Sequence, residues 1–186
     1  MTGDPNNIEA QVNSASSGKK GLPPIDQWHP ELSGEIDIRI ARNGLWLYQG
    51  EPMEREAIPQ LFSTILRRED DGEYYLVTPV EKWRLVVDDA PLLAHSVEVT
   101  GQGSNQQVSV VTNMGERIPI DGEHPLTVGC YPDSDEPRPV VAVRHGLEAR
   151  LVTAAYYDLA NYVEESVQDG RSVLGIRSHG QFFPLG

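Results

Sequence analysis

The chain has 186 residues, of which 39% are hydrophobic and 23% are charged. These fractions are typical of globular proteins and exclude a wholly disordered chain. Its 15 Lys and Arg residues against 28 Asp and Glu residues give a net charge of −13, which argues against nucleic-acid binding because that binding depends on clustered cations. Cys130 is the single cysteine, so a disulfide within the chain is excluded and secretion gains no support.

The first 24 residues contain Asn, Ser, Gly and Pro with isolated apolar residues and no periodicity. Such a segment buries too little surface to offset the entropy lost on ordering, so we predict a flexible tail over residues 1–24. It also lacks the apolar core of a signal peptide, and no apolar run elsewhere has the length of a membrane span. We therefore expect a cytoplasmic protein without a membrane or nucleic-acid partner.

Residues 35–48 predict a β-hairpin. Apolar and polar residues alternate from Glu35 to Ile40, and Asn43-Gly44 is typical of a two-residue type I′ turn. In that register Arg39 lies opposite Tyr48 and Ala41 opposite Trp46. The expected core face carries Ile38, Ile40, Leu45 and Leu47, and the other face carries Asp37, Arg39, Ala41, Trp46 and Tyr48.

The next segment predicts a helix followed by strands. Ile58, Leu61, Phe62, Ile65 and Leu66 form an amphipathic stripe, and we expect the helix to run as far as the Asp71-Gly72 pair. Strands are expected over residues 74–78 and 82–87. Residues 95–130 predict further β structure.

The second half repeats this order. The segment YPDSDEPRP predicts an exposed connector between two halves, and a hairpin, a helix and a strand follow it. The Asp169-Gly170 pair matches Asp71-Gly72, and a helical stripe of tyrosines is expected to pack in the core. We therefore predict an α+β fold with mainly antiparallel sheets, two repeated β-hairpin–helix–strand motifs and additional strands between them. The expected parts are the tail, a first repeat with its following strand over residues 25–92, and a middle β segment with the second repeat over residues 93–186.

The first repeat resembles the DUF1285 family of bacterial proteins. The resemblance is sharpest from Ile38 to Leu92 and includes the string LVTPVE and an acidic pair before Ala90-Pro91. The other residues that carry it are Gly44, Trp46, Tyr48, Gly50, Arg55, Leu61, Phe62, Leu66 and Arg68. The resemblance implies a two-part α+β fold and a role in signal transduction, and it assigns no catalytic residue.

Motifs that would carry catalysis are not found in the sequence. The five histidines are widely scattered and none has the spacing of a metal site, so we expect neither a metal nor a cofactor. The GQGSNQ segment contains G-x-G, but it joins two expected strands and opens no helix that could bind a phosphate. Asp88-Asp89 fits a turn at a strand end better than a catalytic pair.

Two hypotheses on function follow. The first is a non-catalytic binding or regulatory module that contacts an unidentified protein partner, with the oligomeric state, including a homo-oligomer, left open. The second is a ligand-binding domain or enzyme whose site lies between the two repeats and includes Arg39, Arg55, Glu81 and Arg84. Trp46 and Tyr48 complete the candidate binding residues. An aromatic pair beside an arginine is typical of interfaces, whereas the alternative is that other strands bury both aromatic side chains.

Overall fold

The computed structural model describes residues 2–16 and 21–186, which form two compact units. The first unit comprises Met1–Pro91 with His145–Leu147, and the second comprises Leu92–Arg144 with Glu148–Gly186. Both units combine helices with predominantly antiparallel sheets, so the predicted α+β class is correct. Within the described residues, no helix has both the length and the apolar character needed to cross a membrane.

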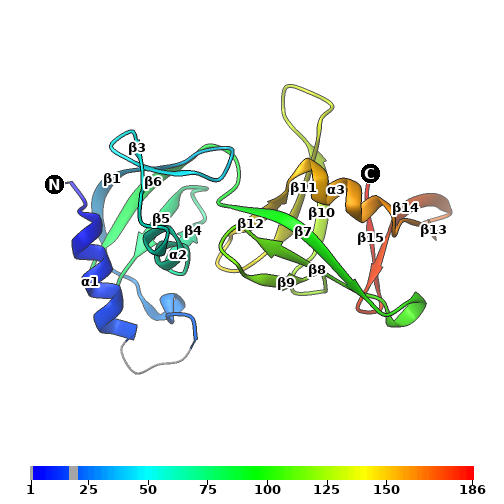
Figure 1. Ribbon diagram of the computed structural model, residues 1–186, viewed down its shortest axis with the longest axis horizontal. Helices are drawn as coiled ribbons and strands as arrows, with labels where there is room; N and C mark the ends of the chain where they lie inside the picture. Colours follow the sequence, from blue (N-terminus) through cyan, green and yellow to red (C-terminus); the bar gives the residue numbers. More distant parts are fainter. Residues whose placement is uncertain (1, 17–20) are drawn as a thin grey trace. The chain divides into compact units, whose positions relative to one another are not determined.

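The first unit contains a six-stranded sheet, sheet A, in the order β3-β2-β1-β6-β5-β4 (Figure 1). Its neighbouring strands are antiparallel except for the central pair β1 and β6, which are parallel. Its strands are β1 (Leu32–Ile40), β2 (Trp46–Tyr48), β3 (Glu51–Pro52), β4 (Leu66–Arg68), β5 (Tyr74–Val77) and β6 (Lys82–Val87). The unit also contains helices α1 (Pro5–Ser16) and α2 (Ala57–Ser63) and the 3₁₀ turn Ile25–Gln27.

The β1–β2 hairpin differs from the prediction by one residue. Ile40 pairs with Trp46 and Ile38 with Tyr48, because the loop has three residues and closes through hydrogen bonds between Ala41 and both Gly44 and Leu45. Gly44 alone in this loop has a positive φ, which is typical of a type I turn followed by a bulge rather than a type I′ turn. A slip of one residue exchanges the two faces of a strand. Trp46 therefore joins the isoleucine face and is 2% exposed, whereas Leu45 is 43% exposed.

The prediction of a flexible tail is wrong for most of residues 1–24. Residues 5–16 form α1, whose Ile8 and Val12 are fully buried. Two apolar residues four positions apart lie on the same side of a helix, so even this polar segment has one apolar stripe. Ahead of α1, Gly3 lies so close to Trp83 and Ile36 that a Cβ atom would have no room. Residues 1 and 17–20, which the same prediction included, lie outside the described residues.

The predicted long helix is also shorter than expected. Helix α2 ends at Ser63, and Leu66 to Arg68 form β4, which pairs with β5. Ile65 and Leu66 are fully buried, so they continue the apolar stripe although the chain has left the helix. Asp71-Gly72 is the turn between β4 and β5 and not a helix end, because Gly72 has φ of +82° and Gly72 N–H donates to the carbonyl of Glu69.

The second unit contains a six-stranded sheet, sheet B, in the order β10-β11-β12-β7-β8-β9, and a three-stranded sheet, sheet C, in the order β13-β14-β15. Helix α3 (Thr153–Ala160) and the 3₁₀ turn Gly103–Asn105 complete the unit. The strands of sheet B are β7 (Leu92–Thr100), β8 (Gln107–Thr112), β9 (Arg117–Pro119), β10 (Leu126–Cys130), β11 (Pro137–Ala142) and β12 (Glu148–Leu151). The strands of sheet C are β13 (Glu164–Gln168), β14 (Arg171–Ser178) and β15 (Gln181–Pro184).

Sheets A and B have the same topology. In each sheet two three-stranded meanders meet at a central parallel pair, formed by the first and last of the six strands: β1 with β6, and β7 with β12. Adding six to every strand number of sheet A gives the strand order of sheet B, read from its opposite edge. The matching segments are thus β1–β6 and β7–β12, and not the two hairpin–helix–strand stretches that the sequence suggests. The strand after α2 belongs to sheet A, whereas the strand after α3 belongs to the separate sheet C.

The predicted connector YPDSDEPRP does not separate two halves. Its central residues form the loop between β10 and β11, which pair with each other, and Pro137 to Pro139 already belong to β11. The Tyr131 N–H donates to the carbonyl of Glu136 and closes this loop. Prolines and acidic residues therefore indicate an exposed hairpin tip here.

Candidate functional site

The six predicted binding residues all belong to the first unit, and the structure does not assemble them into one site. Trp46 is buried, with its ring centroid 6.4 Å from that of Phe62, so it belongs to the core. Its indole N–H is buried and has no hydrogen-bond partner among the described residues. Trp46 is therefore unavailable to a binding partner on the folded surface.

Two of the predicted arginines lie on the face of sheet A opposite Trp46. The Arg39 Nε atom is 2.7 Å from a carboxylate oxygen of Asp88, and Arg84 pairs with Glu35 of the neighbouring strand. The hydrogen bond and charge of Glu35 raise the pKa of the Arg84 guanidinium. Each arginine thus has its own carboxylate on a solvent-exposed sheet face, and the two do not form a joint anion site.

Glu81 connects the LVTPVE segment to helix α1. One of its carboxylate oxygens accepts hydrogen bonds from Gln11 Nε2 at 2.9 Å and from the Trp83 indole N–H at 3.1 Å. The fully buried Thr78 donates its hydroxyl proton to Gln11 Oε1 at 2.7 Å and accepts from the backbone N–H of Glu81. These bonds give the segment a structural role, because they fix the turn and hold α1.

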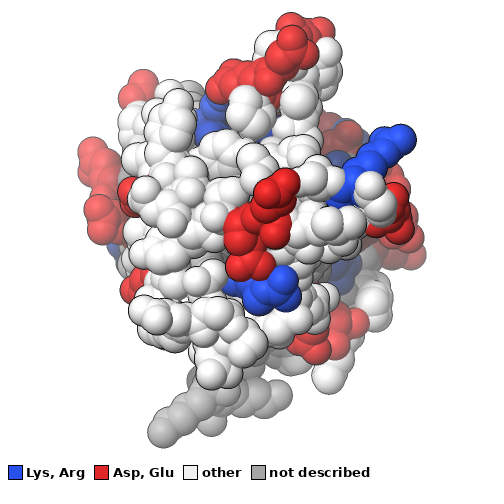
Figure 2. Space-filling view, turned by 90° about the vertical axis from the view of Figure 1, so that its right-hand side faces the viewer, with Lys and Arg blue, Asp and Glu red and all other residues white. Residues whose placement is uncertain are grey.

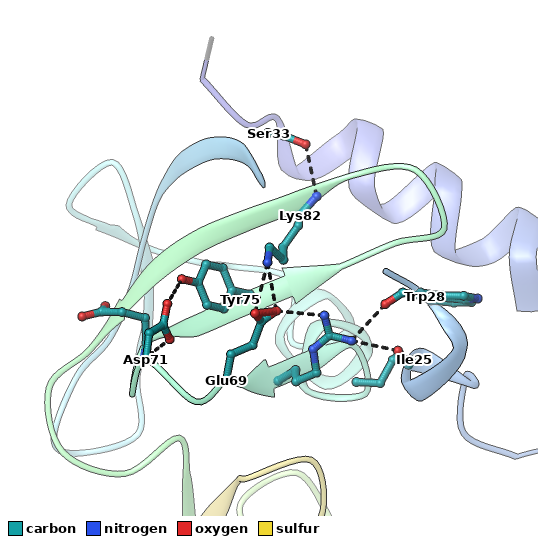
Figure 3. Close-up of polar contacts among 9 residues, drawn as sticks. Ile25, Trp28, Ser33, Glu69, Asp71, Tyr75 and Lys82 are labelled. Carbon is teal, nitrogen blue, oxygen red and sulfur yellow. Dashed lines mark hydrogen bonds and ion pairs between the residues drawn. The ribbon is translucent and has the colours of Figure 1, made fainter. Parts of the chain in front are cut away.

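A second polar cluster lies on the same face as Arg84 (Figure 3). The Glu69 carboxylate accepts from Arg67 at 2.9 Å and from Lys82 at 3.0 and 3.1 Å. Lys82 Nζ also lies 4.7 Å from the ring centroid of Tyr75, whose hydroxyl donates to Asp71 at 2.5 Å. We call these five residues the Glu69 cluster.

The Glu69 cluster holds its acids ionised and its phenol protonated. Burial raises the pKa of Glu69, but the hydrogen bonds and charges of Arg67 and Lys82 outweigh it, so the pKa is lowered overall. The hydrogen bond from Tyr75 lowers the pKa of Asp71, and the same bond raises the pKa of Tyr75 to about 12. A general acid or base works best with a pKa near the operating pH. These three shifts all move away from neutrality, which favours a structural role for the cluster.

Arg67 shows what the cluster stabilises. Its Nη1 atom donates to the backbone carbonyls of Ile25 and Trp28, both at 3.0 Å, while Nη2 binds Glu69. Figure 3 marks these contacts by dashed lines that lead to Glu69, Ile25 and Trp28. The cluster therefore attaches the turn that precedes β1 to the edge strand β4. The predicted helix included Arg67 and Arg68, whereas the structure places both in β4.

Tyr48 and Arg55 line an open pocket of about 340 Å³ in the first unit. Arg55 Nη2 also forms an ion pair at 3.2 Å with the carboxylate of Glu9 in α1. Tyr48 and Arg55 are the two predicted binding residues that the structure brings together. The remaining lining residues are Pro5, Asn6, Glu51, Pro52, Met53, Glu54 and Ile58.

The second unit contains a more enclosed pocket of about 280 Å³, which we call the tyrosine pocket. Three tyrosines, two prolines, one arginine and one glutamate dominate its wall. Its lining residues are Tyr131, Glu136, Pro137, Pro139, Arg150, Leu151, Thr153, Tyr156 and Tyr157. The pocket thus combines apolar rings with one charged group of each sign.

The pocket exists because β12 is shorter than β11. The two strands pair from Ala142 with Glu148 to Val140 with Arg150, and the chain then turns into α3 at Thr153. The Ala142 N–H points toward β10, so backbone N–H groups at positions 137 and 139 would point toward the β12 side, where β12 no longer pairs with β11. Pro137 and Pro139 lack this N–H and lose no ladder bond there. The space beside them is bounded by α3.

Two tyrosines of the pocket differ sharply in exposure. Tyr156 is half-buried, burial raises its pKa, and its hydroxyl donates to the carbonyl of Leu185 at 3.2 Å. Tyr157 is 70% exposed, although sequence periodicity predicted a core stripe that included it. On the pocket's other side, Arg138 lies over the ring of Tyr131 at 6.0 Å. Tyr156 and Tyr131 thus each contact a neighbouring residue, whereas Tyr157 stays accessible to solvent.

Local sequence patterns do not predict the tyrosine pocket, because its residues come from β11, β12, α3 and the loop before β11. The available signals were the two prolines near Tyr131 and the adjacent tyrosines of α3. Each has an ordinary explanation by itself, as connector residues or as helix core. Only the β11–β12 register, which the sequence does not reveal, brings them together.

Across residues 2–16 and 21–186, no three His, Cys, Asp or Glu side chains gather closely enough to hold a metal ion. His124 Nδ1 lies 3.0 Å from Asp121, whose backbone partners are the N–H groups of Glu123 and His124. Burial raises the pKa of Asp121, and the hydrogen bonds from His124 and Glu123 lower it overall. This pair closes the turn before β10.

Two models of one protein family match successive parts of the chain. Residues 23–90 match the model of the N-terminal domain of a protein of unknown function, DUF1285, and residues 91–185 match the model of its C-terminal domain. No curated protein matches the chain.

Two solved structures are also similar. A DUF1285 family protein from Silicibacter pomeroyi DSS-3 is 43% identical, covers 94% of this chain and 93% of its own, and has a TM-score of 0.82. A DUF1285 family protein from Shewanella baltica OS155 is 31% identical, with 67% and 91% covered and a TM-score of 0.53. The two domain models together span nearly all of the sequence, and the chain therefore belongs to the DUF1285 family.

Proposed function

We propose that this protein is a non-catalytic binding module that holds a segment of another protein in the tyrosine pocket. The observation that carries the proposal is the composition of the pocket, with accessible Tyr157 beside Tyr131, Tyr156 and two prolines. Tyrosine is enriched in binding hot spots, because it offers a large rigid contact area at a low cost in side-chain entropy.

The volume of the pocket favours a protein segment over a cofactor. Sites for drug-sized ligands and cofactors usually measure about 300–1,000 Å³. A pocket of about 280 Å³ lies just below that range and suits one or two side chains of a longer partner. Its apolar walls favour an aliphatic or proline anchor, and Arg150 and Glu136 supply polar contacts beside it.

The test is capture of a partner by matched tyrosine variants. Tyr157→Ala removes the exposed wall of the pocket, and Tyr162→Ala removes a 41% exposed tyrosine that does not line it. Tyr157→Ala should alter the free energy of unfolding by less than about 0.5 kcal/mol, and Tyr162→Ala, which removes a more covered ring, by about 1 kcal/mol. In pull-downs from a native lysate, we expect Tyr157→Ala to lose the protein that wild type and Tyr162→Ala both capture. Equal capture by all three would contradict the proposal.

The setting we propose is regulatory and cytoplasmic. The family resemblance supports signal transduction in bacteria, and both solved relatives come from bacterial species. We also infer that the two halves arose by duplication. The identical strand order of sheets A and B supports a repeat of six strands.

The second candidate function is small-ligand binding in the pocket of Tyr48 and Arg55. Its volume of about 340 Å³ lies within the usual range for ligands, and both residues were predicted from the sequence. A screen of small anionic metabolites by thermal shift would test it. A ligand that stabilises wild type but not Arg55→Ala would support this function, and the absence of any stabilising compound would count against it.

A further inference from the structure

Strand β13 is an outer strand of sheet C, and its only protection as a sheet edge is the pair Glu164 and Glu165. Exposed edges attract other strands, and proteins protect them with proline, shortness, charged side chains or a covering element. Of the other outer strands, β3, β9 and β15 each contain proline, β4 has three residues, and β10 packs beside β15. β13 has five residues and no proline, and no described strand pairs with its outer edge.

The hairpin geometry shows which backbone groups point outward from β13. Asp169 and Gly170 both have positive φ values, 50° and 76°, as a type I′ turn requires. In such a turn the flanking pair, here Gln168 and Arg171, is hydrogen-bonded, and the pairs then alternate along the ladder. Glu165 and Val167 therefore direct their N–H and C=O groups toward the open edge.

The same side of the second unit carries exposed apolar side chains. Its large exposed apolar side chains all fall between residues 157 and 174, on or near α3, β13 and β14. Val167 is 72% exposed and Leu174 57%, and the ladder places both on one face of sheet C. Figure 2 views the molecule from the side on which Figure 1 shows these elements, and most of that surface is uncharged. This stretch also carries Asp158, Glu164, Glu165, Asp169 and Arg171, so any self-association here needs a register that keeps like charges apart.

We propose that two copies of the chain associate through β13, which pairs antiparallel with itself around a two-fold axis at Ser166. In this register Glu165 of one copy lies opposite Val167 of the other, so the outward backbone groups of both residues find partners. Glu164 lies opposite Gln168. The third strands of the two copies then flank one continuous sheet.

Charge selects this register over its neighbours. An axis at Glu165 places two glutamates directly opposite each other, which is destabilising. An axis at Val167 places Glu165 opposite Asp169 of the turn. With the axis at Ser166, Gln168 lies between Arg171 of its own hairpin and Glu164 of the second copy. That cation and anion are two strand spacings apart, about 10 Å between their Cα atoms, within reach of long side chains.

The first test measures dimerisation of the full chain by sedimentation velocity over a range of concentrations. Val167→Pro deletes an outward N–H that the hairpin itself does not use, so the fold should tolerate it at an edge. Val167→Thr is the control because it keeps the N–H and the β-branched shape. We expect wild type and Val167→Thr to dimerise with rising concentration and Val167→Pro to stay monomeric. A wild type that is monomeric throughout, or a Val167→Pro variant that dimerises equally, overturns the proposal.

The second test reads the register directly. In a Cys130→Ser background, Ser166→Cys places two thiols at the axis, in a non-hydrogen-bonded pair whose Cα atoms lie about 4.5 Å apart. That separation permits a disulfide. Gln168→Cys is the control, because residue 168 lies opposite Glu164 and far from its own copy. We expect only Ser166→Cys to form a cross-linked dimer on mild oxidation. Equal cross-linking of both variants, or none, overturns the proposed register.

Discussion

Trp46 lies on the buried face of sheet A because its hairpin closes with a three-residue loop. Its side chain packs beside Ile40 and Phe62, and removing a large ring from such a place leaves a cavity. Leu45, which a two-residue turn would bury, is 43% exposed instead. The burial of one aromatic side chain thus depends on one residue of loop length.

The first prediction compares these two neighbours. Trp46→Ala should lower the free energy of unfolding by about 3–5 kcal/mol, because a buried aromatic side chain is lost. Leu45→Ala should cost only about 1 kcal/mol, since this residue is already 43% exposed. Denaturant unfolding of both variants measures the difference. A larger loss for Leu45→Ala would mean that the type I′ register is correct after all.

The second prediction concerns the phenol of Tyr75, whose pKa is raised from 10.0 to about 12 by its hydrogen bond to Asp71. The folded protein retains this proton at pH values where the unfolded chain loses it. The stability from this bond is therefore complete below pH 10 and is lost as the pH rises toward about 12.

Titration by the ultraviolet absorbance of tyrosinate measures this shift. Wild type should contain a component with a pKa near 12 that Tyr75→Phe lacks and that Tyr157→Phe, which removes an exposed phenol, retains. The free energy of unfolding of wild type should also fall more steeply than that of Tyr75→Phe over this pH range. Identical titration curves for wild type and Tyr75→Phe would contradict the assignment.

At the scale of elements, helix α1 depends on a small number of contacts. Its mean composition is polar, yet Ile8 and Val12 are fully buried and Gln11 bonds to both Thr78 and Glu81. These contacts link α1 to the LVTPVE segment. They account for the buried Thr78 and the half-buried Glu81 in the turn of that segment.

The third prediction tests whether α1 belongs to the fold. Ile8→Ala should lower the free energy of unfolding by about 2–4 kcal/mol, as for other fully buried aliphatic residues. Asn13→Ala, on the exposed side of the same helix, should change it by less than about 0.5 kcal/mol. Thermal and denaturant melts compare the two. An unchanged melt for Ile8→Ala would restore the view of residues 5–16 as a tail.

The elements that sequence reasoning predicted well are those with a strong local signal. Alternation identified β1, and the buried runs identified β5 and β6 near their observed limits. The end of α2 was missed, because Ile65 and Leu66 are buried both in a helix and in the strand that forms. The tyrosine pocket was missed for a different reason. It depends on where β12 stops pairing with β11, and such long-range register leaves no local pattern in the sequence.

At the scale of the whole molecule, sheets A and B place their parallel pairs at the same topological position. Strands β1 and β6 in one sheet, and β7 and β12 in the other, have a hydrogen-bonded neighbour on each side. Outer strands have such a neighbour on one side only, so their backbone groups open at a lower free-energy cost. The repeated topology therefore predicts two separate stable centres rather than one.

Hydrogen–deuterium exchange with peptide-level mass spectrometry tests this last prediction on the full chain. Within each sheet, amide protection should fall from the central parallel pair toward the outer strands, so β1 and β7 exchange more slowly than β3 and β9. Burial reinforces the order, since Ile38, Ile40 and Leu92 of the central strands are at most 1% exposed, whereas both residues of β3 are exposed. Peptides from β3 or β9 that exchange as slowly as those from β1 or β7 would contradict it. In sheet C the outer strand β13 should exchange rapidly at low protein concentration and more slowly as the concentration rises, because association would cover its outward N–H groups.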